Sequence, residues 1–182
     1  MIYFTSDLHF FHTKVIAYDN RPFSSLEEMH EVIISNWNLT ISKNDIVYVL
    51  GDIGLCGISR LKPIFDRLTG SIILIRGNHD LQNNFTIKRF LTAGICNIKD
   101  VMDINSFSLG GNRIVISHYP YNDFRFKQLS PVDCGDWLIH GHCHLNSPKI
   151  GDRMINVGCM HWDYFPVSQN QISEIINNEK TS

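Results

Sequence analysis

The feature that most restricts the fold is a repeated junction where a short apolar run gives way abruptly to acidic, amide or imidazole side chains. Three such junctions occur in the first half: Ile2–Ser6 before Asp7-Leu8-His9, Asp45–Leu50 before Gly51-Asp52, and Ser71–Ile75 shortly before Gly77-Asn78-His79-Asp80. Runs of this length and composition are typical of β-strands. The polar residues are therefore expected where loops leave the ends of strands.

Helical patterns separate these runs. Ser24–Thr40 repeats apolar residues at helical spacing, and Ser24 with Glu27 predicts a capping box at its start. Ser59–Leu68 shows the same periodicity, with Gly70 just past its end. A strand, a helix and a strand in this order favour a right-handed crossover between parallel strands. The first half therefore predicts a βαβαβ arrangement.

The second half changes character. A helix is predicted near Thr86–Ala93, after which short strands follow, and we expect them to form a meander. The predicted strands are Ile104–Leu109, Arg113–Ser117, Trp137–His140 and Met154–Val157, the first two joined by Gly110-Gly111-Asn112, a hairpin signature. Ser168 and Gln171 predict the cap of a final helix. No linker or repeat divides the chain, so we expect one α/β domain, bordering on α+β, over residues 1–182.

Composition excludes several classes of function. A formal net charge of −2 over 182 residues gives no basic field for sequence-tolerant binding of nucleic acid. The longest apolar runs are strand-sized, and the amino terminus lacks a basic stretch followed by an apolar one, so we expect a soluble cytoplasmic protein. The odd number of cysteines, without a C-x-x-C pair, indicates reduced thiols. Oligomeric state has no marker in the sequence.

Two further polar segments, Ser117-His118 and Gly141-His142-Cys143-His144, also follow apolar runs. Each segment alone is weak, because a Gly-Asp turn is often only a turn and a lone histidine is more often a partly buried hydrogen-bonding residue. Together, carboxylate, amide and imidazole groups suit manganese, iron or zinc, whereas few thiolates are available for a sulfur site. The five segments together therefore favour a metal centre.

These five segments, from Asp7 to His144, resemble the signature of the calcineurin-like metallophosphoesterase family, and they stand in the family's order. The resemblance implies a sandwich of two β-sheets flanked by helices, with a binuclear metal centre at the sheet edges. It implies that one metal is held by Asp7, His9, Asp52 and His144, and the other by Asp52, Asn78, His118 and His142. Manganese is the expected ion, with iron, zinc, nickel and magnesium as alternatives.

The same resemblance implies a catalytic role for His79, which faces the substrate without binding metal, and a role for Asp80 in orienting its ring. Two cations about 3.5 to 4 Å apart can share a water, lower its pKa and clamp the phosphoryl oxygens for in-line attack by the bridging hydroxide. An imidazole that titrates near neutral pH suits a general acid for the departing alkoxide. Removing His79 should therefore slow turnover and leave the metals bound.

Several residues outside the signature are candidates for substrate contacts. Arg21 and Arg76 could each grip a phosphate bidentately, although a solvated surface arginine is an equally ordinary explanation. His12 could line the pocket beside His9 or hydrogen-bond within its loop. For His140 and His161, support of the metal ligands competes with an ordinary core or surface position. The aromatic stretch from Tyr119 to Ser130 could stack a ring or simply cover the core.

Three other functions compete with hydrolysis of a small phosphate ester or nucleotide. Protein serine/threonine phosphatases of the family usually write Gly-Asn-His-Glu and place further acidic and arginine residues after the bridging aspartate, unlike Gly51-Asp52-Ile53-Gly54 here. A nuclease is not favoured, because the length leaves little room for a capping or DNA-binding domain and the net charge does not attract a polyanion. A catalytically silent scaffold usually lacks the catalytic histidine or several ligands, and every position is filled here. Monoester and diester cleavage remain equally open.

Overall fold

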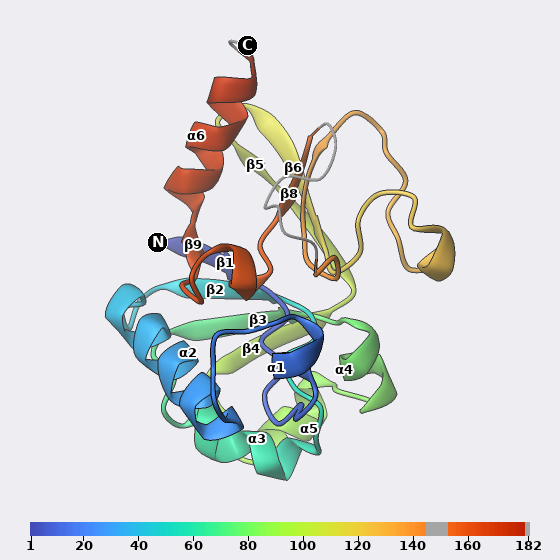
Figure 1. Cartoon of the computed structure of the whole chain (residues 1–182). Helices are drawn as coiled ribbons and strands as arrows, with labels where there is room; N and C mark the ends of the chain where they lie inside the picture. Colours follow the sequence, from blue (N-terminus) through green and yellow to red (C-terminus); the bar gives the residue numbers. More distant parts are fainter. Residues whose placement is uncertain (145–152, 181–182) are drawn as a thin grey trace.

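The computed structural model describes residues 1–144 and 153–180, and its strands form two sheets (Figure 1). The first sheet has the order β4-β3-β2-β1-β9 and consists of β1 (Ile2–Thr5), β2 (Ile46–Leu50), β3 (Ser71–Ile75), β4 (Ile98–Met102) and β9 (Val167–Ser168). The second has the order β5-β6-β7-β8 and consists of β5 (Ile104–Leu109), β6 (Asn112–Ser117), β7 (Trp137–His140) and β8 (Met154–Asn156). Two mixed sheets with flanking helices confirm the predicted fold class.

Parallel pairing in the first sheet brings the ends of its strands together. Thr5 pairs with Val49, and Leu50 pairs with Ile75, so β1, β2 and β3 all end at one edge. The βαβαβ prediction is confirmed for this half. We did not predict β4, because Lys99 and Asp100 interrupt its apolar pattern, nor the short β9, which pairs antiparallel with β1.

The second sheet departs from the predicted meander. β5 and β6 form the expected antiparallel hairpin, but β6 with β7 and β7 with β8 pair in parallel. A parallel pair needs a connection of about a dozen residues or more, and residues 118–136 and 141–153 supply such lengths. As a consequence, β6 and β7 end at the same side, which places His118 and Gly141 next to each other: Gly141 N donates to His118 O at 3.1 Å.

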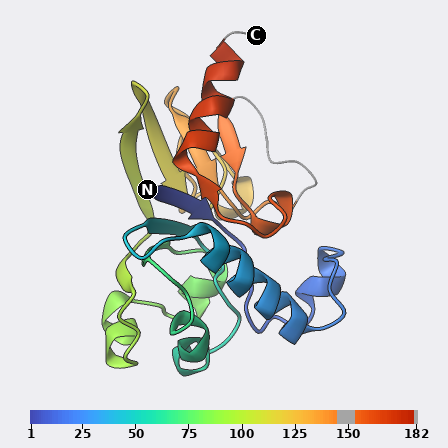
Figure 2. The same cartoon turned by 90° about the vertical axis from the view of Figure 1, so that its left-hand side faces the viewer.

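The helices are divided between two positions. Helices α2 (Leu26–Thr40), α3 (Ile58–Phe65) and α5 (Ile87–Thr92) lie on the side of the first sheet that faces away from the second sheet (Figure 1). Helix α6 (Gln169–Lys180) lies beside the second sheet in both views (Figure 2). The short helices α1 (Val15–Tyr18) and α4 (Asn78–Gln82) follow the loops after β1 and β3. Within the described residues, no helix combines the length and apolar character needed to cross a membrane.

Two helix caps were predicted, and only one is found where expected. Gln171 N donates to Ser168 Oγ at 3.3 Å at the start of α6, which confirms that cap. At α2 the cap is shifted by one residue, because Ser25 Oγ accepts from Glu28 N at 3.1 Å. Ser24 lies outside the helix and donates from its hydroxyl to the Glu28 carboxylate. Two adjacent serines offered equivalent caps, and the packing of the chain into α2 decided between them.

The first sheet is buried on both faces, which explains its continuous apolar strands. Val47 and Leu74 point toward the helices and pack in one core with Trp37 of α2. Phe4 and Leu50 point the other way. They join a second core between the sheets that includes Ile116, Ile139 and Ile172, the last from α6. A sheet held from both sides is a rigid base for the loops at its edge.

Candidate metal centre

Five loops, each at the carboxyl end of a strand, bring the predicted polar side chains together. The first group contains Asp7, His9 and His144, which lie far apart in the chain. His144 Nε2 stands 3.3 Å from Asp7 Oδ1 and 3.3 Å from His9 Nε2. These three side chains are arranged so that one ligand atom from each could hold a single ion.

The second group lies on the other side of Asp52. His118 Nε2 stands 3.3 Å from Asn78 Oδ1 and 3.2 Å from His142 Nδ1. Asp52 Oδ1 is 3.7 Å from His118 Nε2, and Asp52 Oδ2 is 4.0 Å from His9 Nε2. The two oxygens of one carboxylate therefore face the two groups, one each.

The chemistry of these atoms fits divalent cations. His118 Nδ1 lies 2.8 Å from Leu50 O, and because a carbonyl only accepts, this nitrogen carries the proton. Its Nε2 therefore presents a lone pair toward Asn78 Oδ1 and His142 Nδ1. Electron-pair donors that face one another at such distances repel unless a cation or a proton lies among them. Mixed imidazole, carboxylate and amide donors suit manganese, iron or zinc.

The backbone at the centre is strained. Four of the candidate ligands, Asp7, His9, Asp52 and His142, have φ between 52° and 65°, in the left-handed region that residues with a side chain rarely adopt. The first turns are held by paired main chains: Asp7 N donates to Gly51 O at 3.1 Å, and His9 N donates to Asp52 O at 3.0 Å. Strain of this kind persists only where surrounding structure enforces it, and it clusters at functional sites.

Two glycines are required by close approach. A Cβ at Gly77 would lie 2.2 Å from Asp52 Oδ1, and one at Gly141 would lie 1.9 Å from Ser6 Oγ and 2.6 Å from Asp7 Oδ2. The neighbours at Gly77 include backbone as well as side chain, so little can move aside. The glycines that open the Gly-Asn-His-Asp and Gly-His-x-His segments therefore let the ligand loops pack directly against the aspartates.

Comparison with known proteins decides the family. Residues 1–164 match the family described as calcineurin-like phosphoesterase. The chain belongs to this family. Membership supports metal-dependent phosphoester hydrolysis as the activity of this phosphoesterase, and it implies divalent metal ions at the candidate residues.

Relatives cover nearly the whole phosphoesterase. It is 32% identical to the uncharacterized protein MJ1445 of Methanocaldococcus jannaschii, over 98% of this chain and 93% of the relative. It is 30% identical to the Gene 66 protein of Mycobacterium phage D29, over 97% and 96% of the two chains. A solved structure from Aquifex aeolicus, that of the protein of unknown function AQ665, superposes with a TM-score of 0.72 at 26% identity, covering 96% of this chain and 98% of that chain.

The electrostatics of the phosphoesterase favour a cation at the centre. Burial and the charge of Asp7 raise the pKa of Asp52 to about 7. Burial also opposes ionisation of Asp7, but the hydrogen bond with His144 and the nearby imidazoles hold its pKa below the usual range. For His144 burial lowers the pKa, yet hydrogen bonds with Asp19 and Asp7 outweigh it and raise the pKa to about 10. A field that holds a proton on His144 also attracts a metal ion.

His79 and His12 line the centre beside His9. The ring centroid of His9 lies 5.5 Å from that of His79 and 5.3 Å from that of His12. His79 Nε2 is 3.8 Å from Asp52 Oδ2, close enough that it too could reach an ion. Burial, then the charges of His12 and His118, lower the pKa of His79. His79 therefore stands where its ring can reach both an ion and a substrate beside the centre.

Asp80 has backbone partners that the sequence did not indicate. This fully buried carboxylate accepts hydrogen bonds from three backbone amides, those of Asp52 at 2.7 Å, Gly77 at 2.8 Å and Ile53 at 3.2 Å. No hydrogen bond joins Asp80 to the ring of His79 among the described residues, and His79 Nδ1 has no partner there. Asp80 therefore joins the loops after β2 and β3, and its role in orienting the histidine stays a prediction.

The two arginines expected to contact substrate have partners within the protein. Arg21 is buried, with 4% of its surface exposed, and its Nη2 donates to Asp7 O at 2.8 Å. Arg76 donates from Nε and Nη2 to the two carboxylate oxygens of Asp103, at 2.8 and 2.9 Å. Both guanidinium groups are already engaged by the protein. Their sequence neighbourhood could not indicate this, because the acceptors come from tertiary contacts.

The other histidines and the aromatic stretch surround the ligand loops. His140 is buried and its Nδ1 lies 2.8 Å from Gly141 O, while His161 Nε2 lies 3.2 Å from Asn156 Nδ2. Among the described residues, neither ring forms a hydrogen bond with a candidate ligand side chain. The rings of Tyr119 and Phe126 stack at 4.9 Å and each packs on His142, at 5.1 and 4.9 Å. The aromatic stretch therefore supports a candidate ligand.

Sequence reasoning missed two aspartates that stand behind the candidate ligands. Asp19 Oδ1 lies 2.7 Å from His144 Nδ1, and Asp123 Oδ2 lies 3.6 Å from His142 Nε2. Both occur in loops, without a motif of their own. Their only signal was a position in the two long loops that follow His9 and His118, which is too weak to select a single residue.

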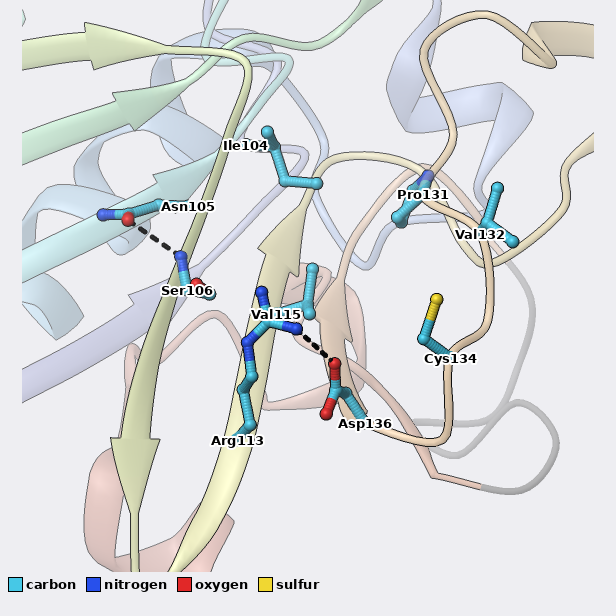
Figure 3. A pocket seen from close by; sticks show the side chains of 9 residues that line it. All are labelled: Ile104, Asn105, Ser106, Arg113, Val115, Pro131, Val132, Cys134 and Asp136. Carbon is cyan, nitrogen blue, oxygen red and sulfur yellow. Dashed lines mark hydrogen bonds and ion pairs between the residues drawn. The ribbon is translucent and has the colours of Figure 1, made fainter.

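Two hollows of similar volume differ in their relation to the centre. One of about 490 Å³ reaches Asp19 and His144 and continues past His161 to Tyr164. The other, of about 500 Å³, lies over β5 and β6 and is shown in Figure 3, where Arg113 pairs with Asp136. None of the candidate ligands lines the second hollow. The first is therefore the hollow beside the metal centre.

Proposed function

We propose that this phosphoesterase is a binuclear hydrolase of small phosphate esters or nucleotides. The observation that carries the proposal is the position of Asp52, whose two carboxylate oxygens face separate groups of donor atoms at 3.7 and 4.0 Å. One carboxylate between two donor groups is the arrangement expected of a bridging ligand. In the proposed assignment Mn²⁺ is the ion, and nickel, iron, zinc and magnesium are alternatives to be compared directly.

Each ion would be held by four of the described side chains, with Asp52 shared. The first would be held by Asp7, His9, Asp52 and His144, and the second by Asp52, Asn78, His118 and His142. When bound, two divalent cations supply a source of nucleophile near neutral pH and neutralise charge on the phosphoryl group. The protein contributes fixed orientation, since the ligands stand on strained turns at the edge of a doubly packed sheet.

In the proposed reaction His79 donates a proton to the oxygen of the departing alcohol. Its backbone amide donates to Asp52 Oδ1 at 3.0 Å, which fixes the start of α4 against the shared carboxylate. The side chain remains 24% exposed, more than the 3% of His9 and 0% of His118. This exposure allows contact with substrate but does not set His79 apart from the proposed ligands, since the side chain of His144 is 29% exposed; the role of acid comes from the family resemblance.

Small substrates are favoured because, in the described part of the chain, the two arginines expected to bind phosphate are engaged by other protein groups. Arg21 and Arg76, the two arginines expected to bind phosphate, both donate to protein acceptors. With those two engaged, recognition of phosphate would depend mainly on the ions and neighbouring histidines. Extended contacts along a polyanion need many free cationic groups and are not supported. Both monoesters and diesters remain within the proposal.

The experiment compares the parent, His79→Ala and Asp52→Asn. Metal content is measured after loading with Mn²⁺, and hydrolysis is measured on bis-p-nitrophenyl phosphate and p-nitrophenyl phosphate. The parent should bind two ions and cleave at least one ester. His79→Ala should keep both ions and lose about 10²- to 10⁴-fold in turnover, whereas Asp52→Asn should lose metal and activity together.

The outcomes separate the parts of the proposal. A parent that binds one ion and cleaves neither ester contradicts the binuclear hydrolase. A His79→Ala protein that loses an ion instead makes His79 a ligand and contradicts its assignment as acid. Phosphomonoesters, cyclic nucleotides, dinucleotides and short oligonucleotides, tested with each metal, then define the substrate and the ion.

A further inference from the structure

The two ring nitrogens of His144 face different partners, and the one away from the candidate ion is held by an aspartate. His144 Nδ1 lies 2.7 Å from Asp19 Oδ1, while Nε2 faces Asp7 Oδ1 and His9 Nε2, each at 3.3 Å. An ionised carboxylate only accepts hydrogen bonds. The proton on the Asp19 side is therefore carried by Nδ1, and a neutral ring presents its lone pair from Nε2 to the ligand group.

Asp19 is itself held in place by a buried arginine. Arg21 donates from Nε to Asp19 Oδ2 at 3.0 Å and forms an ion pair with the same oxygen through Nη2 at 2.9 Å, which leaves Oδ1 for His144. The side chains of Asp19 and Arg21 are 6% and 0% exposed. A buried arginine without its carboxylate would be costly, so this pair is constrained to stay together.

The same guanidinium also reaches the backbone of the first ligand loop. Arg21 Nη2 donates to Asp7 O at 2.8 Å and Nη1 donates to Leu8 O at 3.3 Å. Asp7 is one of the residues with positive φ, so its carbonyl is held in a strained turn. One side chain thus ties the backbone of Asp7 to the carboxylate behind His144, and these two candidate ligands come from opposite ends of the chain.

We propose that Asp19 and Arg21 are positioning residues for the first of the two ions. Asp19 sets the tautomer and the orientation of His144, and Arg21 fixes the position of Asp19 relative to the backbone of Asp7. Partners of this kind behind a metal-bound histidine typically change metal affinity by about 10- to 100-fold. The inference rests on the proposed binuclear centre, but it concerns residues outside the five segments that define the family resemblance.

The neighbouring ligand provides an internal contrast. Asp123 Oδ2 stands 3.6 Å from His142 Nε2, beyond hydrogen-bond distance, and Asp123 is paired with Arg125. The side chain of Arg125 is 56% exposed, whereas that of Arg21 is buried. A fixed chain of arginine, aspartate and histidine therefore stands behind the first ion alone, and loss of Asp19 should act on one metal and spare the other.

The test is a double-mutant cycle read by metal binding. Mn²⁺ alone is titrated into metal-free parent, Asp19→Asn, His144→Ala and the double variant, and the two dissociation constants are measured. Asp19→Asn should weaken one ion by about 10-fold or more and leave the other within about twofold. In the His144→Ala background it should have no further effect, because an effect that acts through His144 disappears with the ring.

Asp136→Asn is the matched control, since Asp136 also pairs with an arginine, Arg113 at 2.7 Å, but lies over the second sheet (Figure 3). It should change neither constant. If Asp19→Asn leaves both constants unchanged, or weakens metal equally with and without His144, the positioning role is overturned. A parent that does not bind two ions contradicts the proposed function instead, so the two failures are distinguishable.

A measurement on the unmodified chain covers the case in which Asp19→Asn fails to fold. Histidine ¹⁵N spectra of the Zn²⁺-loaded parent should show His144 with its proton on Nδ1 and its metal bond at Nε2. A proton on Nε2, or a metal bond at Nδ1, would overturn the proposal without any substitution. Neither readout depends on catalytic activity.

Discussion

Replacing Asp80 with alanine should destabilise the metal-free protein severely. The carboxylate is fully buried and accepts from the backbone amides of Asp52, Ile53 and Gly77 at 2.7, 3.2 and 2.8 Å. Alanine leaves three buried donors without that acceptor. An unsatisfied buried donor costs about 1 to 3 kcal/mol, so the expected loss for three donors is on the order of 3 to 9 kcal/mol. That is a large part of the roughly 5 to 15 kcal/mol that stabilises a typical domain.

The assay is urea unfolding of chelator-treated protein, followed by circular dichroism. Asp80→Asn should lose less than Asp80→Ala, because an amide oxygen can still accept from one or two of the donors. Asp66→Ala is the control. Asp66 makes an exposed ion pair with Lys62 at 2.7 Å, and its loss should stay within about 0.5 kcal/mol.

The result also distinguishes the two roles considered for Asp80. If Asp80 joins the loops after β2 and β3, its removal lowers the free energy of unfolding even when no metal or substrate is present. A residue that only orients His79 would slow turnover and leave stability intact. A loss below about 1 kcal/mol in Asp80→Ala would refute the reasoning, since it would mean that the three amides find other partners.

Three further predictions follow from the same loops. Gly77→Ala should abolish tight Mn²⁺ binding, because its Cβ would lie 2.2 Å from Asp52 Oδ1; calorimetry showing parent-like affinity would contradict this. Arg76→Ala should leave KM within about twofold, because the arginine pairs with Asp103 on the surface. A tenfold rise in KM would indicate instead that Arg76 contacts the substrate. In metal-free protein, burial and the charge of Asp7 raise the pKa of Asp52 to about 7. Between about pH 4 and 7 the folded state therefore keeps a proton that the unfolded state has released. The contribution of Asp52 to the free energy of unfolding is complete below about pH 4 and is lost as the pH rises toward 7. Urea midpoints of the parent should therefore fall relative to Asp52→Asn across that window, and parallel curves would contradict the shift.

The location of the candidate centre was predictable because it depends on local sequence. A short run rich in β-branched and aromatic residues, such as Ile46–Leu50, is typical of a strand buried on both faces, and Gly51-Asp52 cannot continue that run. Parallel pairing then places such junctions at one edge. The family resemblance added which donor belongs to which ion, an assignment that remains a proposal.

The supporting contacts were not predictable, because their acceptors are distant in sequence. Arg21 was expected to contact substrate, and the sequence did not indicate that the fold brings Asp7 O and the Asp19 carboxylate to its guanidinium group. Asp80 was expected to orient the adjacent His79, and the sequence did not indicate that backbone amides of the loop after β2 also donate to its carboxylate. In both cases burial removes water as a partner, and the nearest protein group takes its place.

The sequence by itself determined most of the strands, the junctions at their ends and the kinds of donor that stand there, because these follow from hydrophobic periodicity and side-chain chemistry. Only the tertiary structure decided the parallel order of the second sheet and the partners of each arginine, aspartate and histidine. Strand order depends on the path that the long connections take between strands. Hydrogen-bond partners depend on which polar groups are buried next to each other. Both are properties of the whole packed chain, and no single segment carries them.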